Sequence, residues 1–420
     1  MAENPRKVIV IGGGIIGVCS AYYLWEAGYK VQLIEKDEVG MGCSYGNAGL
    51  IVPSHIVPLA APGMISQGLK WLLNPESPFY IKPRLNKRLI SWLWLFYKSA
   101  NAKHVQQSGK GLRDLNMLSR SLFQEISKVE GINFELKKKG LLMLSKSTKY
   151  HEEEMEVAHM ANELGMEAHE VGPEEIQALN PDIKIDAYRG VHYLKDAHIQ
   201  PGDFVKSLVK YLEKQGVEFH RGTEVHSFLL DGSKVKGVIT SKGEVEADDF
   251  VLACGALSPH LSSQLNLNLP MQSGKGYSVT IENAQYKPVT PLILMEAKVA
   301  VTPMGRDLRF AGTMEIAGDQ LNINQRRVKG ILNAIPNYLP EYDRLEEAYS
   351  NKAWSGLRPC SPDGLPYIGK FQKFNNVVAA TGHAMMGVSL GPVTGKLVAE
   401  IIAGERTSVD IKAYNPDRFN

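Results

Sequence analysis

The apolar residues near the N-terminus form two short runs with a helical stretch between them. Residues 8–11 (VIVI) are an unbroken β-branched run, and residues 31–34 (VQLI) are similar in character. Such runs are typical of parallel strands that are buried on both faces of a sheet. Residues 15–27 are mostly small or apolar and predict a helix, with Gly28 at its C-terminal end. The pattern therefore predicts a strand–helix–strand unit at the start of the chain.

Farther along the chain, helical and strand-rich stretches alternate. Helical patterns lie near residues 84–130, 149–166, 173–180, 201–215, 325–339 and 391–404. Strand patterns lie at residues 140–148, at 225–253 with turns at Asp231-Gly232 and Lys242-Gly243, and within 271–350. Segments of nucleotide-binding type therefore occupy residues 1–58, 196–270 and 351–420, and different material fills residues 59–195 and 271–350. We expect a discontinuous nucleotide-binding domain interleaved with a second domain, with a ligand cleft between them.

The first predicted turn carries the glycine spacing of a dinucleotide-binding loop. Gly12 allows a tight turn after the strand, Gly14 lets a pyrophosphate approach the backbone, and Gly17 lets helix and strand pack closely. Glu35 ends the second strand, where its carboxylate can accept hydrogen bonds from a ribose and would repel a 2′-phosphate. Cys254 and Gly255 follow another buried strand and form a second candidate contact with the same ligand. Because three separate segments converge on the ligand, the pattern favours a large, tightly held cofactor, and FAD fits better than NAD.

The composition of the chain limits the classes of protein and of partner that fit it. The chain has 420 residues, 44% of them hydrophobic and 22% charged, and a net charge of +2, which gives no argument for nucleic acid as a partner. The four cysteines are far apart, which favours reduced thiols in a cytoplasmic protein over disulfides or a metal site. The N-terminus enters the first strand almost at once and does not have the pattern of a secretory signal.

Residues 84–104 combine tryptophan, tyrosine and aliphatic side chains with flanking lysines and arginines. This composition is typical of a segment that lies on a membrane surface, and the alternative is a buried helix at a domain or subunit contact. No stretch of the sequence reaches the ~20 apolar residues that a membrane-spanning helix needs. We therefore expect a cytoplasmic protein, with peripheral contact to the inner face of the membrane through residues 84–104 as one of two hypotheses.

Several motifs together resemble the FAD-dependent D-amino-acid oxidase and glycine oxidase superfamily, and within it the bacterial D-amino-acid dehydrogenase branch. They are VIVIGGGIIGVCSAYYL, GNAGLIVP, PLAAPGMISQGLKWLL, SGKGYSVTI, WSGLRPCSPDGLPYIG and TGHAMMGVSLGPVTGKLVAEIIAG. The resemblance covers nearly the whole chain, and the block around Arg358 is its most specific part. It implies an α/β fold in which a Rossmann-like, glutathione-reductase-type FAD-binding domain is interleaved with an α+β substrate domain built on an antiparallel sheet.

The resemblance also implies which residues contact non-covalent FAD. They are Gly12, Gly14, Ile15, Ile16 and Gly17 at the diphosphate; Glu35 and Lys36 at the adenosine ribose; Ser44, Asn47, Ala48, Gly49 and Leu50 beside the flavin; Val225 near the adenine; Cys254 and Gly255 near the diphosphate; and Gly382, His383, Gly387, Ser389 and Leu390 around the flavin ring. Some relatives attach their flavin to a cysteine, but Cys360 is not at that position, which aligns with Gly356.

Arg358 matches the arginine that binds the substrate carboxylate in the superfamily. From its sequence context alone, Arg358 could instead pair with Asp363 or another local acid. Tyr277 is a weaker candidate for a substrate hydrogen bond, since a strand tyrosine is commonly only packed. His55 is a weaker candidate for a contact with the substrate amine, since a loop histidine is commonly solvated. Val299-Ala300 stand where the oxidases have a second carboxylate-binding tyrosine, which puts that second contact in doubt.

The expected reaction is oxidative deamination of a D-amino acid. Arg358 holds the carboxylate, hydride passes from Cα to flavin N5, and hydrolysis of the imine gives a 2-oxo acid and ammonia. The dehydrogenase branch and residues 84–104 favour a quinone or another electron-transfer acceptor over oxygen. The alternatives are an oxidase of glycine or sarcosine, a dehydrogenase of D-proline or D-hydroxyproline, a flavin module of an RNA-modifying enzyme, and a catalytically silent FAD-binding protein.

Overall fold

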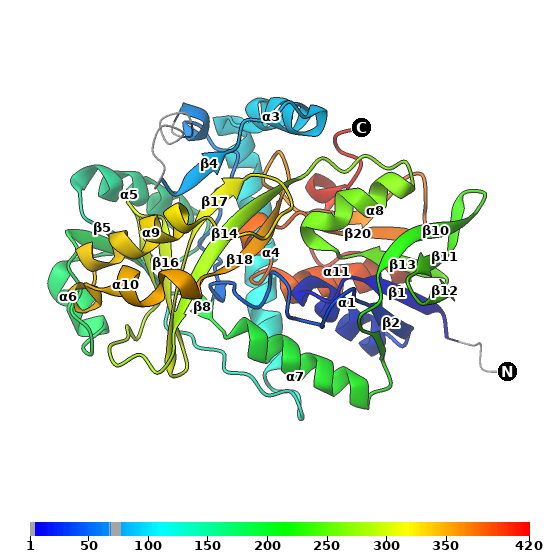
Figure 1. Cartoon of the computed structure of the whole chain (residues 1–420), viewed down its shortest axis with the longest axis horizontal. Coiled ribbons are helices and arrows are strands. Elements are labelled where there is room, and N and C mark those ends of the chain that lie inside the picture. Colours follow the sequence, from blue (N-terminus) through cyan, green and yellow to red (C-terminus); the bar gives the residue numbers. More distant parts are fainter. Residues whose placement is uncertain (1–4, 67, 69–76) are drawn as a thin grey trace.

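The computed structural model describes residues 5–66, 68 and 77–420. It consists of two lobes, one around each of two large sheets, with the long helix α4 (Ala102–Ile126) running between them (Figure 1). Of the motif at 58–73, Gln67 and residues 69–73 lie outside the described residues.

The first sheet joins strands that are far apart in the sequence. In spatial order its strands are β19 (Tyr367–Lys370), β20 (Val377–Thr381), β13 (Asp249–Leu252), β1 (Lys7–Ile11), β2 (Lys30–Ile34) and β9 (Glu218–His220). All neighbours are parallel except β19 and β20. The predicted strands at 8–11 and 31–34 thus lie side by side, and Val8, Ile9 and Val10 are fully buried, as a strand covered on both faces requires.

Helices cover one face of this sheet and a small sheet covers the other. The helices are α1 (Ile15–Glu26), α7 (Pro201–Lys214), α11 (Gly391–Ala403) and α4, whose apolar residues share one core cluster. Gly395 of α11 lies so close to α1 that a Cβ there would come within 2.4 Å of the Cys19 carbonyl oxygen. The second face carries the antiparallel strands β10 (Val225–Asp231), β11 (Lys234–Thr240) and β12 (Gly243–Glu246), which confirms the predicted turns between them.

The second large sheet is mostly antiparallel. Its path runs β18 (Trp354–Cys360), β14 (Gln272–Ile281), β17 (Asp307–Ile316), β16 (Val299–Met304), β15 (Leu292–Leu294), β5 (Leu141–Ser145), β7 (Arg189–Tyr193) and β6 (Ala168–Val171), and β4 (Phe79–Ile81) pairs with β17. Only the β15–β5 and β17–β4 pairs are parallel in the described residues. Around it lie α5 (Thr148–Glu163), α6 (Pro173–Leu179), α9 (Gln325–Ala334) and α10 (Leu345–Tyr349), while α8 (Ser258–Gln264) belongs to the first lobe.

The predicted helical region 84–130 is divided into two helices. α3 (Lys87–Ser99) ends two residues before Asn101, which is the N-cap of α4. The Asn101 side chain accepts a hydrogen bond from the His104 backbone N–H at 3.0 Å, which favours the start of a new helix there. Asn86 caps α3 in the same way. The two helices can therefore point in different directions.

The architecture agrees with the predicted α/β class, in which a parallel sheet and an antiparallel-rich sheet are interleaved along the chain. β18 belongs to the second sheet although it follows residue 351, so the last nucleotide-type segment contributes to both lobes. The two-stranded pair of β3 (Leu50–Ile51) and β8 (Ala197–His198) ties two of the predicted segments together. The domain boundaries themselves stay a prediction.

Candidate active site

A cavity of about 830 Å³ lies between the two large sheets. This volume is near the upper end of the range for small-molecule sites. Its wall combines the turn after β1, the turn after β13, the loop 41–50, the inner faces of β14, β17 and β18, and residues 383–388. The cavity therefore brings together all three nucleotide-type segments and the second sheet.

Most of the predicted site residues line this cavity. They are Gly12, Gly14, Ile15, Ile16, Glu35, Lys36, Ser44, Asn47, Ala48, Leu50, Cys254, Gly255, His383 and Gly387, together with His55, Tyr277 and Arg358. Six others do not reach its wall: Gly17, Gly49, Val225, Gly382, Ser389 and Leu390. Of these, Val225 is buried in the core beneath β10–β12, and the Ser389 hydroxyl donates to Asn116 Oδ1 at 2.6 Å. The roles assigned to these residues stay a prediction.

The glycines of the first turn act sterically as the motif predicts. Gly12 has φ +109°, and a Cβ there would lie 2.5 Å from the Ala253 carbonyl oxygen. A Cβ at Gly17 would lie 1.8 Å from the Gly12 carbonyl oxygen, so only glycine lets helix α1 begin this close to β1. The result is an open helix N-terminus that faces the cavity, which is a favourable place for a phosphate group.

Glu35 lies at the end of β2 and borders the same turn. Its Oε2 accepts a hydrogen bond from the Gly13 backbone N–H at 2.6 Å, and its Oε1 accepts one from the Asp37 N–H at 3.0 Å. Each carboxylate oxygen has more than one lone pair, so these bonds leave acceptor capacity for hydroxyl groups in the cavity. These two bonds fix the Glu35 carboxylate beside the glycine turn, and its contact with a ribose stays a prediction.

A buried arginine that the sequence analysis did not single out holds the loop 41–50. Arg309 of β17 donates from Nη1 to the carbonyl oxygens of Tyr45 and Asn47, at 2.9 and 2.8 Å, and from Nε to Thr280 Oγ1. Within the loop, Ser44 Oγ accepts from the Ile15 N–H at 3.0 Å. Burial lowers the pKa of Arg309 from its usual value. An arginine between the apolar residues Leu308 and Phe310 was the available signal for this role.

Arg358 lies on β18 and points its guanidinium across the neighbouring strands. Its Nη1 donates to the Thr313 carbonyl oxygen of β17 at 2.6 Å, and it crosses β14 at Gly276, where a Cβ would lie 2.0 Å from Nη1. Burial lowers the pKa of Arg358 from its usual value, yet an arginine keeps its charge at neutral pH. The sequence predicted neither Thr313 nor Gly276 as its support.

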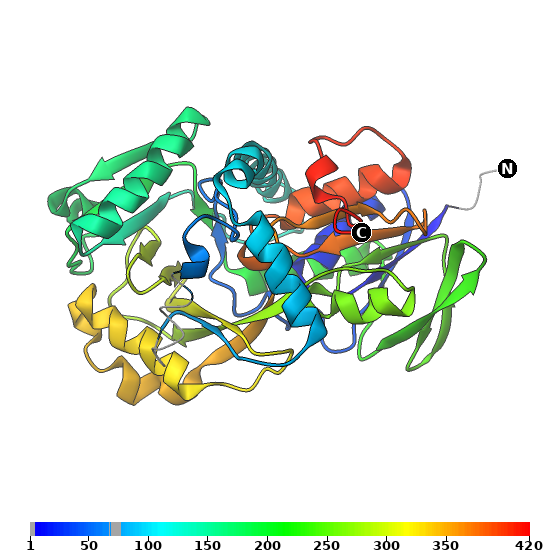
Figure 2. The same ribbon diagram turned by 90° about the horizontal axis from the view of Figure 1, so that it is seen from above.

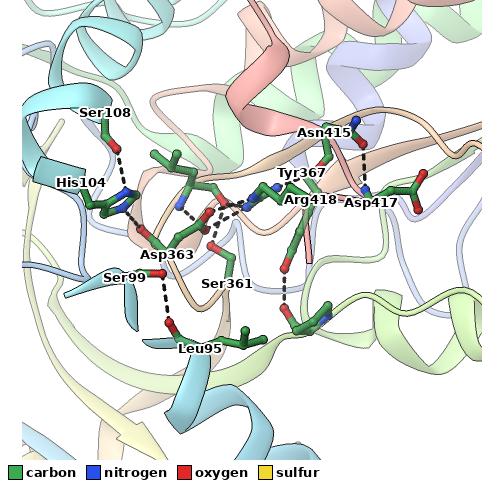
Figure 3. Close-up of polar contacts among 12 residues, drawn as sticks. Leu95, Ser99, His104, Ser108, Ser361, Asp363, Tyr367, Asn415, Asp417 and Arg418 are labelled. Atoms are coloured by element: carbon green, nitrogen blue, oxygen red, sulfur yellow. Dashed lines mark hydrogen bonds and ion pairs between the residues drawn. The ribbon is translucent and has the colours of Figure 1, made fainter. Parts of the chain in front are cut away.

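Asp363 does not pair with Arg358. Figure 3 shows that Asp363 instead forms an ion pair with Arg418. Nε and Nη2 of Arg418 donate to the two carboxylate oxygens of Asp363 at 2.7 and 2.9 Å. No acidic side chain among the described residues forms an ion pair with Arg358. The guanidinium on the cavity wall is therefore available to an anionic ligand.

Tyr277 and His55 both line the cavity, but their hydrogen bonds and their surroundings differ. The Tyr277 hydroxyl donates to Glu315 Oε2 and accepts from the Asn324 N–H, and burial raises its pKa. Its phenol group is thus already engaged within the protein. His55 is half-buried, and burial lowers its pKa to about 4, so its imidazole is neutral at physiological pH. Its ring nitrogen Nδ1 lies 3.1 Å from Ser54 Oγ.

The remaining wall shows two further features that the sequence did not reveal. The Trp354 ring fits between Gly46 and Gly356, where added Cβ atoms would lie 2.2 and 2.1 Å from the ring, so both glycines are required by packing. Lys298, in the left-handed region at φ +52°, lines the end of the cavity next to Ala300. Ala300 offers only a methyl group, so it supplies no second carboxylate contact.

Helix α3 presents two different faces. Leu89 and Trp92 are buried, and the Trp92 indole N–H donates to the Cys360 carbonyl oxygen at 2.9 Å. Ile90 and Trp94 on the other face are 56% and 57% exposed. Figure 2 shows α3 lying on the surface across the boundary between the lobes. Residues 84–104 therefore combine a buried face with an exposed aromatic face, and no described helix is long and apolar enough to cross a bilayer.

Comparison with known proteins agrees with this geometry. Residues 7–401 match the model of the DAO family, FAD dependent oxidoreductase. The chain is 33% identical over 409 residues to a D-amino acid dehydrogenase of Neisseria meningitidis serogroup C, covering 96% of this chain and 97% of the relative. The crystal structure of glycine oxidase from Geobacillus kaustophilus has a TM-score of 0.77 and 21% identity, covering 99% of this chain and 100% of that chain. The L-proline dehydrogenase structure from P. horikoshii has a TM-score of 0.75 and 20% identity, covering 99% and 98%.

A glycine turn at a helix N-terminus, a fixed carboxylate at the end of the next strand and one large cavity define a dinucleotide-dependent enzyme. The protein belongs to the DAO family of FAD-dependent oxidoreductases, and its mixed α/β fold is that of the glycine oxidase structure.

Proposed function

We propose that the protein is a D-amino-acid dehydrogenase that binds FAD non-covalently. The observation that carries this proposal is the Arg358 guanidinium, which faces the cavity without an acidic partner among the described residues. A charged side chain without an ion-pair partner on a cavity wall favours the binding of a ligand of opposite charge, because the two form charge-assisted hydrogen bonds. The full-length similarity to relatives named D-amino acid dehydrogenase supports an amino acid as that ligand.

The chain's own residues would hold FAD along the cavity. The open N-terminus of α1 would accept the diphosphate, Glu35 the adenosine ribose, and the loop fixed by Arg309 would lie beside the flavin. When bound, FAD supplies the chemistry of hydride acceptance. Cys360 is buried, and burial raises the pKa of its thiol to about 12, so it is poorly reactive and unsuited to covalent attachment of the flavin. Cys43 is an exposed thiol at the cavity wall.

The substrate would lie between this cofactor and β18. Arg358 holds the carboxylate through a charge-assisted contact, and its own bond to Thr313 fixes the direction of the guanidinium. The buried walls exclude water from the carboxylate and so strengthen this contact. The substrate amine faces away from Arg358, and an imine product leaves to be hydrolysed to a 2-oxo acid and ammonia.

The exposed face of α3 supports an electron acceptor in or at a membrane. Ile90, Trp94 and Tyr97 are exposed together, Trp94 and Tyr97 stack at 6.0 Å, and Lys98 lies over the Trp94 ring at 5.0 Å. Aromatic rings beside cations suit the interface of an anionic bilayer. We therefore extend the proposal to a quinone or electron-transfer partner that is reached at the membrane surface through residues 84–104.

An anaerobic substrate screen tests the function. The purified holoprotein is mixed with D- and L-amino acids, glycine, sarcosine and both prolines, and bleaching of the flavin absorbance is followed. We expect D-amino acids to reduce the flavin, and hydrogen peroxide formation in air to be slow against dye reduction. Preference for glycine or sarcosine with stoichiometric peroxide would contradict the proposal.

The Arg358→Ala variant tests the carboxylate contact. Loss of a contact between a buried guanidinium and a carboxylate costs on the order of 3–5 kcal/mol, so flavin reduction should require far more substrate. The matched control is Arg189→Ala, because Arg189 forms an exposed ion pair with Glu170. Unchanged turnover in Arg358→Ala would remove this residue from the mechanism.

A further inference from the structure

A chain of three polar side chains leads from the cavity into the protein interior. The pairing of β3 with β8 places Ile51 opposite Ala197, which brings Asp196 beside Ser54. Asp196 Oδ1 accepts from the Ser54 backbone N–H at 3.1 Å, and Ser54 Oγ lies 2.5 Å from Asp196 Oδ2. Ser54 Oγ also lies 3.1 Å from His55 Nδ1.

The ends of this chain lie in different surroundings. Asp196 is fully buried and Ser54 is 4% exposed, whereas His55 lines the cavity. His55 Nε2 has no hydrogen-bond partner among the described residues. It is not fully buried, because it is absent from the set of buried polar atoms that have no partner. Nε2 is therefore the end of the chain that a molecule in the cavity can reach.

The hydrogen bonds determine which nitrogen of His55 carries the proton. An ionised Asp196 can only accept, so the Ser54 hydroxyl donates to it. The Ser54 oxygen then accepts from His55 Nδ1–H, which leaves Nε2 with a free lone pair. If Asp196 is protonated, every donor in the chain reverses and Nε2 carries the proton instead.

We propose that His55, Ser54 and Asp196 form a proton relay that accepts a proton from the α-ammonium group of the substrate. The inference rests on the proposed function, since an amino acid enters the cavity as a zwitterion and must lose this proton before it can be oxidised. His55 is the catalytic residue that touches the substrate, and Ser54 and Asp196 act through it.

The proton transfer balances without any other reactant. The substrate N–H bond breaks as Nε2–H forms, Nδ1–H passes its proton to Ser54 Oγ, and the Ser54 proton passes to Asp196 Oδ2. The ammonium and the carboxylate both become neutral, and His55 is neutral before and after. After the imine product has left the cavity, water that enters it takes the proton back along the same path, and Asp196 is ionised again.

The electrostatics of the chain fit a relay rather than a histidine that becomes charged. Burial alone lowers the pKa of His55 to about 4, which opposes formation of an imidazolium. Burial raises the pKa of Asp196 to about 7, although the bonds from Ser54 and the charge of Arg120 on α4 oppose this shift. Glu154 on α5 also raises the pKa of Asp196, and the phenol of Tyr193 on β7 lies close to it.

The pH dependence of flavin reduction tests the relay. Rate constants divided by apparent Kd are measured anaerobically from pH 6 to pH 10 for wild type, Ser54→Ala, Ser54→Thr and His55→Gln. We expect Ser54→Ala and His55→Gln to lose on the order of 100-fold at pH 7 and to approach wild type near pH 10, where the substrate amine enters unprotonated. Ser54→Thr keeps a hydroxyl and should recover most of the loss.

The matched control is Ser108→Ala. Ser108 is a buried serine on α4 whose hydroxyl lies 3.3 Å from Nδ1 of His104 (Figure 3), and it does not line the cavity. This variant should keep the wild-type pH profile. A loss in Ser54→Ala or His55→Gln that is equal at every pH would overturn the relay and leave the proposed function intact. Flavin that no amino acid reduces would overturn both.

A spectroscopic measurement checks the arrangement without substrate. In holoprotein labelled with ¹⁵N-histidine, the His55 signal is assigned by its absence in His55→Gln. At pH 8, Nδ1 should be protonated and Nε2 unprotonated, and Ser54→Ala should abolish this preference. The opposite tautomer in wild type at pH 8 would refute the relay, whatever the kinetics show.

Discussion

The substitution Gly276→Ala tests how the strands aim Arg358. Gly276 lies on β14, between the strand that carries Arg358 and the strand whose Thr313 carbonyl anchors it. The backbone of Gly276 is outside the left-handed region, so alanine is tolerated there conformationally. The new methyl group would instead occupy the space of the guanidinium.

The size of the effect follows from the geometry. The Cβ would lie 2.0 Å from Nη1, against 3.4 Å or more in ordinary contact, so the guanidinium must move by roughly 1.4 Å. That displacement breaks the 2.6 Å bond to Thr313 and removes the guanidinium from its position on the cavity wall. Misplacement of a binding group by about 1 Å costs on the order of 100-fold in rate, and the broken carboxylate contact about 2–4 kcal/mol. We expect kcat/KM for D-amino acids to fall by roughly 30- to 1000-fold.

Anaerobic stopped-flow measurement of flavin reduction separates substrate binding from the chemical step in this variant. The control is Gly274→Ala on the same strand, where the new Cβ meets the flexible Met314 side chain and the Cys360 Sγ rather than the Arg358 guanidinium. Both variants should retain FAD, because neither position lies in the glycine turn. If Gly276→Ala reduced its flavin as fast and at the same substrate concentration as Gly274→Ala, the carboxylate would not be held by Arg358 in this orientation.

Three further predictions concern the cofactor, stability and the surface. Replacing Glu35 with alanine should weaken FAD binding by about 1.5–3 kcal/mol, roughly 10- to 150-fold in Kd, measured by fluorescence titration of the apoprotein; unchanged affinity would mean that the ribose lies elsewhere. Burial raises the pKa of Glu154 from 4.5 to about 7, so the folded state favours its protonated form and loses stability as the pH rises through 7. Glu154→Gln should therefore gain stability relative to wild type by up to about 3 kcal/mol between pH 5 and pH 8 in urea unfolding, and a constant difference would contradict this pKa. Replacing both Ile90 and Trp94 with serine should weaken binding to anionic vesicles at least tenfold in flotation assays, whereas Leu230→Ser, which alters an exposed leucine on β10, should not.

Local chemistry made the nucleotide half of this protein predictable. A β-branched run, a glycine turn and a helix of small residues can satisfy their packing in few ways, and Gly17 packs against Gly12, which is close to it in the chain. The hairpin turns at residues 231–232 and 242–243 were predictable for the same reason. The resemblance then placed Arg358 in the site, although its sequence context alone left pairing with Asp363 open.

Contacts between distant segments decided the rest. Asp363 is taken by Arg418, a residue near the C-terminus that no local pattern connects with it. The close packing of Gly356 against Trp354, and the support of Arg358 by Thr313, exist only once β14, β17 and β18 lie side by side.

By itself, the sequence determined the strand, glycine turn and helix at the start of the chain, because this unit is built from one short segment whose residue types allow few other structures. Only the tertiary structure decided which charges on the cavity wall stay free and which are neutralised. Pairing and burial depend on side chains brought together by the sheets, as His55, Ser54 and Asp196 are joined through the pairing of β3 with β8. Separation along the chain says little about such contacts, since the cost of closing a long loop rises only slowly with its length.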